Sequence, residues 1–109
     1  MDLYIQMEKL INLLNSALGE YKKRGAEYGD SQKNYRIAVA KEMLKLKAEG
    51  MPATLVYDVA RGNENVAELK RQEIISESLY KSCQEAINTY KLEIKILQEQ
   101  INKEYRNEI

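Results

Sequence analysis

The last third of the chain carries its apolar residues on one narrow helical face. From Tyr80 onward these residues recur at alternating steps of three and four, and the same face extends back to Val66. Its members are Val66, Leu69, Tyr80, Cys83, Ile87, Tyr90, Ile94, Leu97 and Ile101. Because the stretch follows the heptad period and contains neither Gly nor Pro, it predicts a long amphipathic helix that packs against another helix.

The first segment keeps the same period along a broader face. Its regular positions hold Leu3, Met7, Leu10, Leu14, Ala17 and Tyr21. The residues that widen the face are Ile5, Ile11, Leu13 and Leu18. A face of this width predicts a helix that contacts two neighbours.

The helical pattern weakens at Gly25 and Gly29, because each glycine costs a helix about 1 kcal/mol relative to Ala. Two alternatives remain open: a break at Gly29 with a new helix from Ser31, or one long helix that is locally weak, with a kink near residues 25–30 as the compromise. Tyr21, Tyr28 and Tyr35 are spaced by seven, and this register survives only if the helix runs through. From Tyr35 onward the pattern is strong again, and its register moves by one position, onto Val39, Met43 and Leu46.

A short segment with helix-breaking glycine and proline residues separates the two long helical patterns. Gly50 is expected to end the first helix, Pro52 to stand in the first turn of a short helix, and Gly62 to end it. The short helix is expected to close the open end of the fold with one apolar face, formed by Leu55, Val56 and Val59. The candidate caps of the last helix are Asn63 and Asn65.

These elements predict an all-α fold with a single domain, 1–109. A first arm (2–49) and a last arm (63–107) form a long helical hairpin, antiparallel and coiled-coil-like, with a short connector helix (53–61) at its tip. Folding back is expected to place Met43 near Leu69 and Tyr21 near Lys91. Arg36 or Lys41 is expected to pair with Glu73, a polar interruption of the second apolar face. Because two helices cannot bury both broad faces, a homodimer forming a four-helix bundle is predicted.

The amino-acid composition limits the cellular location and the classes of binding partner that are expected. The chain of 109 residues has 17 basic and 17 acidic side chains, and 44% of its residues are apolar. A zero net charge argues against a nucleic-acid or anionic-membrane binder, since both usually show a net basic face. No stretch approaches the roughly 18 apolar residues of a membrane span. Cys83 is the only cysteine, so no intramolecular disulfide forms, and a cytoplasmic location is predicted.

The residue types also argue against catalysis. The chain has no His, which removes an imidazole base and the commonest metal ligand. No phosphate-binding glycine loop or dinucleotide fingerprint is present. We therefore predict that the protein is not an enzyme and holds no metal and no cofactor.

Two sets of residues are candidates for binding. A partner protein is expected to contact the tip through Tyr57, Asp58, Arg61 and Asn63. As the alternative, nucleic acid would be contacted by Lys22, Lys23, Arg24, Lys33 and Arg36.

Residues 35–105 resemble small helical proteins encoded in phages and prophages of Gram-positive bacteria, a group with no established activity. The matching stretches are Ala38-Val39-Ala40-Lys41, Glu49-Gly50-Met51-Pro52-Ala53-Thr54, Val59-Ala60-Arg61-Gly62, Val66-Ala67-Glu68-Leu69-Lys70 and Tyr80-Lys81-Ser82. The resemblance implies a phage protein in the host cytoplasm. Together with the predicted helical surfaces, it predicts a protein that binds a host or phage protein as an adaptor or inhibitor, for example one that blunts host defence. The alternative is an accessory factor of phage DNA replication or recombination.

Overall fold

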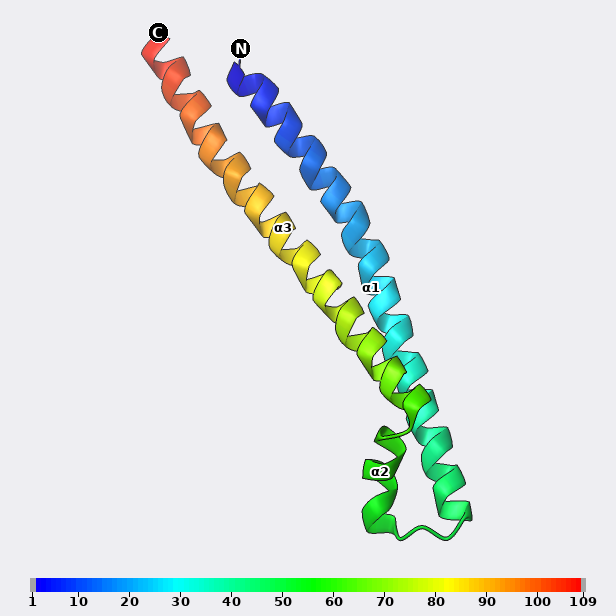
Figure 1. The fold of residues 1–109 in the computed structure, drawn as a ribbon. Helices are drawn as coiled ribbons and strands as arrows, with labels where there is room; N and C mark the ends of the chain where they lie inside the picture. Colours follow the sequence, from blue (N-terminus) through cyan, green and yellow to red (C-terminus); the bar gives the residue numbers. More distant parts are fainter. Residues whose placement is uncertain (1, 109) are drawn as a thin grey trace. The chain divides into compact units, whose positions relative to one another are not determined.

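The computed structural model describes residues 2–108, and nearly all of them are helical. Helix α1 spans Asp2–Ala48, α2 spans Ala53–Arg61 and α3 spans Glu64–Glu108 (Figure 1). No strand occurs among these residues. The predicted all-α helical hairpin with a short connector helix is confirmed, and α2 begins and ends at the predicted residues.

Helix α1 remains helical through Gly25 and Gly29, so the break considered at Gly29 does not occur. The heptad register explains why, because it continues through this stretch without a shift. The half-buried positions that carry the register on from Tyr21 are Arg24, Tyr28, Ser31 and Tyr35. Packing at regular steps against a second helix outweighs the helix propensity that the glycines forfeit.

The turn after α1 depends on Gly50. The N–H of Gly50 bonds to the carbonyl of Lys47 at 3.0 Å, and the N–H of Met51 bonds to that of Leu46 at 3.1 Å. This pair of bonds is a Schellman motif, which requires a left-handed residue, and Gly50 has a φ of 90°. Gly50 is thus the expected end of the first helix, whereas Pro52 stands one residue outside α2, at its N-cap.

Helix α2 buries a different face from the one expected. Val56 and Ala60 are 0% exposed, and they form a cluster with Leu46 of α1. Leu55 and Val59 are 51% and 44% exposed, so the predicted face of Leu55, Val56 and Val59 is wrong for two of its three members. The small Ala60 is buried together with Val56, and the longer pair of Leu55 and Val59 is left outside the cluster.

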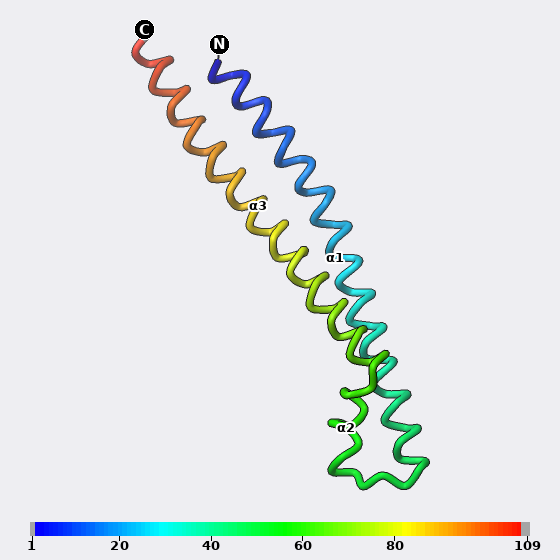
Figure 2. Tube along the Cα trace, in the orientation of Figure 1, coloured from blue at the N-terminus to red at the C-terminus, as the bar shows by residue number. Residues whose placement is uncertain are grey.

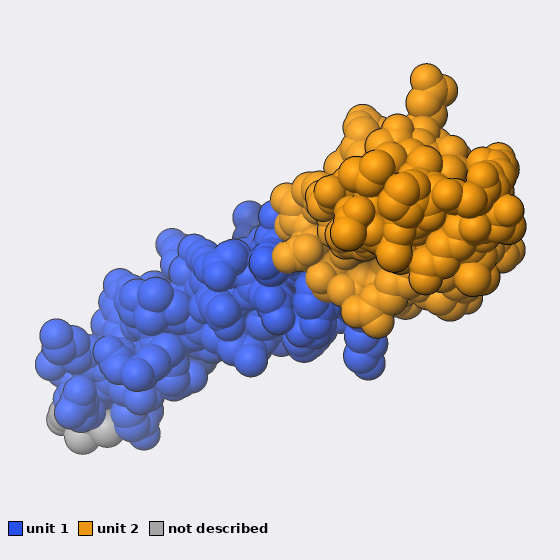
Figure 3. Space-filling view, turned by 90° about the horizontal axis from the view of Figure 1, so that it is seen from below, with its two compact units in different colours: residues 1–23, 80–109 blue, residues 24–79 orange. Residues whose placement is uncertain are grey.

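The chain divides into two compact units (Figure 3). Residues 1–23 and 80–109 form one, which we call the two-helix unit, and residues 24–79 form the other, the three-helix unit. In the two-helix unit α1 and α3 run side by side in opposite directions (Figure 2). Its interior contains Ile87, Leu97 and Ile101 of α3, all buried.

In the three-helix unit, α1 changes partner along its length. Tyr35 faces α3, where the Nζ of Lys70 lies 4.8 Å from the centroid of the Tyr35 ring. Met43, which is predicted to lie near Leu69, packs against the cluster formed with α2. The one-position shift of the apolar register therefore coincides with the contact between α1 and α2.

This change of partner also sets the register of the hairpin. Because α2 folds back along the end of α1, α3 begins beside residues well before that end. Asn63 and Val66 line one groove with Asn34 and Ile37 of α1. In the two-helix unit, Tyr21 stacks on Tyr80 and lines one groove with its predicted neighbour Lys91.

Candidate interaction surfaces

The flank of α2 formed by Leu55 and Val59 is the most exposed apolar pair on the short helix. The two residues lie four positions apart, so they project from the same side of α2. Helical geometry places Tyr57 and Arg61 on the opposite side of the buried Val56. We call Leu55 and Val59 the α2 flank. The sequence did not reveal this exposed surface. Val56–Ala60 and Leu55–Val59 are both apolar pairs with the same spacing, so the pattern does not show which pair is buried.

The four predicted tip residues have distinct environments. The Arg61 guanidinium lies 5.4 Å from the centroid of the Tyr57 ring, a cation–π pair within one helical turn. Asp58 is exposed. The Asn63 side-chain oxygen accepts hydrogen bonds from the N–H groups of Asn65 at 3.0 Å and Val66 at 3.1 Å. Asn63 is therefore the N-cap of α3, one of the two predicted caps, and its side-chain oxygen is already engaged.

The basic residues proposed for nucleic-acid contact are divided between the units. Lys22 and Lys23 are exposed in the two-helix unit, and Lys33 and Arg36 are exposed in the three-helix unit. Arg24 is half-buried and pairs with Glu27 at 3.1 Å. The role of this set in binding nucleic acid stays a prediction.

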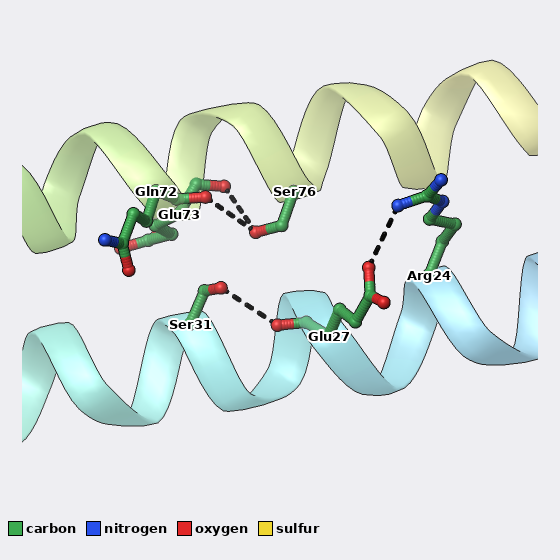
Figure 4. A network of polar contacts seen from close by, with 6 residues as sticks. All are labelled: Arg24, Glu27, Ser31, Gln72, Glu73 and Ser76. Atoms are coloured by element: carbon green, nitrogen blue, oxygen red, sulfur yellow. Dashed lines mark hydrogen bonds and ion pairs between the residues drawn. The ribbon is translucent and has the colours of Figure 1, made fainter.

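One stretch of α1 and α3 in the three-helix unit carries a network of polar contacts (Figure 4). Ser31 donates to the Glu27 carbonyl at 2.9 Å, and Ser76 donates to that of Gln72 at 2.9 Å. Each hydroxyl is thus satisfied within its own helix, and Ser76 is buried without a partner from the other helix. In this stretch the two hydroxyl groups therefore form their hydrogen bonds within each helix rather than between the helices.

Glu73 lies in the same polar stretch, but its expected partner is wrong. It pairs with Lys70 of its own helix, at 3.6 Å from Oε1, and not with Arg36 or Lys41. The Glu73 side chain is 13% exposed, and its Oε2 is buried without a hydrogen-bond partner among the described residues. Lys70 reaches Glu73 first because a separation of three residues places both on one helical face.

A tyrosine pair links the two helices of the two-helix unit. The rings of Tyr21 and Tyr80 stack with centroids 4.8 Å apart, and their hydroxyl oxygens are 2.6 Å apart. The amide of Gln84 donates to the Tyr21 hydroxyl at 3.1 Å. The hydrogen bond with Tyr80, and then that from Gln84, lowers the pKa of Tyr21. The hydrogen bond with Tyr21, and then burial, raises the pKa of Tyr80.

Exposed apolar side chains outnumber buried ones. Among the described residues, eight apolar residues are buried, whereas sixteen large ones are between 38% and 68% exposed. Scattered exposed apolar residues are ordinary on a protein surface, whereas contiguous apolar patches are not, so the position of these residues on each helix matters.

The described residues contain neither a cluster of metal-binding side chains nor a helix suited to cross a membrane. No group of three or more side chains from His, Cys, Asp and Glu lies close enough together to hold a metal ion in this part of the chain. No described helix has both the length and the apolar content needed to cross a membrane. Comparison with known proteins finds no matching family model, no matching curated protein and no matching solved structure.

Proposed function

We propose that this protein is a non-enzymatic interaction protein that binds another protein through the α2 flank. The observation that supports this best is the division of the apolar residues of α2. Val56 and Ala60 complete the core at 0% exposure, whereas Leu55 and Val59 remain about half exposed and add nothing to it. Apolar residues four positions apart are the usual anchors by which a helix enters an apolar groove.

The proposed partner surface is an apolar groove as wide as one helix. Exposed Asp58 lies beside the flank on the helical surface and matches a groove with a polar rim. In line with the resemblance of residues 35–105 to phage proteins, the proposed partner is a host or phage protein. The protein acts on it as an adaptor or as an inhibitor.

A capture experiment with matched variants tests the flank. Leu55→Glu places a charge at the proposed anchor, and Leu44→Glu places the same charge on α1 of the same unit, where Leu44 is 68% exposed. The tagged wild-type chain and both variants are incubated with a lysate of Gram-positive host cells. A bound protein is expected with the wild type and with Leu44→Glu, and it is expected to be lost with Leu55→Glu.

The captured protein is then purified, and its affinity for each variant is measured by calorimetry. Leu55→Glu is expected to weaken binding by roughly a hundredfold, the effect of disrupting a central anchor. Equal affinity of Leu55→Glu and the wild type contradicts the flank as the binding site.

A titration with DNA separates this function from the nucleic-acid alternative. Affinity for DNA that falls steeply with salt and weakens in Lys33→Glu would favour the alternative, because phosphate contacts release counterions. The absence of DNA binding at low salt is the expected result.

A further inference from the structure

In the two-helix unit, α1 carries more apolar surface than α3 covers. The buried residues of α1 are Val39 and Leu46, and both lie in the three-helix unit. Every apolar residue of α1 described in the two-helix unit is at best half-buried, although α3 buries three of its own there. One neighbouring helix therefore leaves this part of α1 incompletely covered.

The uncovered residues form a line. Tyr4, Ile11 and Leu18 are 63%, 43% and 38% exposed, and they follow one another at steps of seven. This spacing places them on one side of α1, beside the face that meets α3. We call them the α1 stripe. The α1 stripe adds a third line of apolar residues beside the two heptad positions that face α3. This pattern is typical of a helix that packs against a second helical neighbour.

The segment that contains most of the stripe carries no charge. Residues 10–19 include no acidic or basic side chain, although 31% of the chain is charged. Their polar residues are Asn12, Asn15 and Ser16. An uncharged segment with exposed apolar residues matches the composition of an interface centre, where charged residues are depleted.

We propose that a second copy of this chain covers the α1 stripe, with the two α1 helices antiparallel and a two-fold axis at Ile11. Ile11 then meets its own copy, and Tyr4 meets Leu18 of the partner subunit. In such a contact a residue on the axis always faces itself, so a charge there would repel its mate. The uncharged segment and the symmetric spacing of the stripe about Ile11 both satisfy this requirement.

The surface area of the chain is sufficient for this dimer. The chain exposes 8108 Å², whereas a folded monomer of 12.7 kDa exposes roughly 6,200 Å². The surplus of roughly 1,900 Å² exceeds the roughly 800 Å² that each partner buries in an interface of standard size. The α1 stripe lies in the two-helix unit, so the proposed contact does not depend on the α2 flank.

Sedimentation of matched variants tests the dimer and its surface. The wild type is expected to sediment as a dimer, and Ile11→Glu is expected to weaken dimerisation by roughly a hundredfold, because both copies place a carboxylate at the axis. Leu92→Glu is the control: Leu92 is 59% exposed on the outer side of α3, and its variant should remain a dimer. Circular dichroism confirms that each variant keeps its helices. A monomeric wild type, or a dimer that survives Ile11→Glu, overturns the proposal.

Disulfide trapping tests the antiparallel arrangement in a Cys83→Ala background. Ile11→Cys is expected to form a covalent dimer on oxidation, since the two copies of position 11 meet at the axis. Tyr4→Cys alone should not, whereas a mixture of Tyr4→Cys and Leu18→Cys chains should form the mixed dimer. Efficient cross-linking of Tyr4→Cys with itself indicates parallel helices and overturns the antiparallel arrangement.

Discussion

Both units contain a part of α1 and a part of α3. They differ in the residues at which the two helices face each other and in whether α2 packs against them. In the three-helix unit, the facing sides of α1 and α3 include polar residues such as Ser31 and Glu73. The most buried cluster of this unit lies where α2 packs against α1. In the two-helix unit, the facing sides are apolar, but no third helix closes the core. The comparison teaches that a third helix, more than an apolar seam, produces complete burial here. Among the residues whose burial is described, only Val56, Ala60 and Val66 fall to 2% exposure or less, and all three belong to the three-helix unit.

The largest expected effect distinguishes the two faces of α2. Val56→Asp puts an unpaired carboxylate into the core of the three-helix unit and should lower the free energy of unfolding by about 3 kcal/mol or more. Val59→Asp makes the same change three residues away on the exposed flank and should stay within about 0.5 kcal/mol of the wild type. Urea unfolding followed by circular dichroism measures both. Equal losses would mean that Val59 is buried as well.

The turn that brings α2 back onto α1 gives the next effect. Gly50→Ala forces a Cβ into a left-handed conformation and should cost about 1–2 kcal/mol of unfolding free energy. Gly62→Ala is the matched control, because Gly62 has a φ of −81° and an added Cβ would lie at ordinary contact distance, 3.5 Å from the Val59 carbonyl oxygen. Its melting temperature should match or exceed that of the wild type. A Gly50→Ala chain as stable as Gly62→Ala contradicts the Schellman turn.

A smaller effect of opposite sign is expected from the polar seam. Glu73→Leu removes a buried carboxylate oxygen that has no hydrogen-bond partner and should raise the unfolding free energy by about 1 kcal/mol. Glu68→Leu applies the same substitution to an exposed ion pair with Arg71 and should change it by less than about 0.5 kcal/mol. If Glu73→Leu lowers the unfolding free energy, the carboxylate stabilises the contact between α1 and α3. The polar residues of the three-helix unit would then contribute to its stability.

The smallest effect concerns the tyrosine pair of the two-helix unit. Because the pKa of Tyr21 is lowered, the folded chain loses that proton before the unfolded chain does, so this residue favours folding as the pH rises toward 10. Because the pKa of Tyr80 is raised, its contribution is lost as the pH rises from 10 through the raised value.

Phenolate absorbance at 295 nm measures this pair directly. Tyr80→Phe removes the main cause of the lowered pKa, so the earliest phenolate ionisation should move toward higher pH. Tyr105→Phe is the control, since Tyr105 is 61% exposed and should leave that ionisation in place. An unchanged first ionisation in Tyr80→Phe would contradict the hydrogen bond between the two rings.

The sequence by itself determined the helices and their ends. The heptad spacing of Val66 to Ile101 predicted α3, and Gly50 and Asn63 predicted a helix end and a cap, because these signals depend on a few neighbouring residues. The spacing of Tyr21, Tyr28 and Tyr35 favoured a continuous α1 through Gly29. The helix propensity lost at two glycines favoured a break, so the sequence did not decide between the two.

Only the tertiary structure decided which faces meet. Leu55–Val59 and Val56–Ala60 are equivalent pairs within an isolated helix, and contact with α1 alone selects the pair that includes the smaller side chain. The register of the hairpin has the same origin, because α2 occupies the end of α1 and α3 must begin further back. Heptad spacing is unchanged by sliding one helix along another, so the sequence pattern could not supply the register that places Tyr21 on Tyr80.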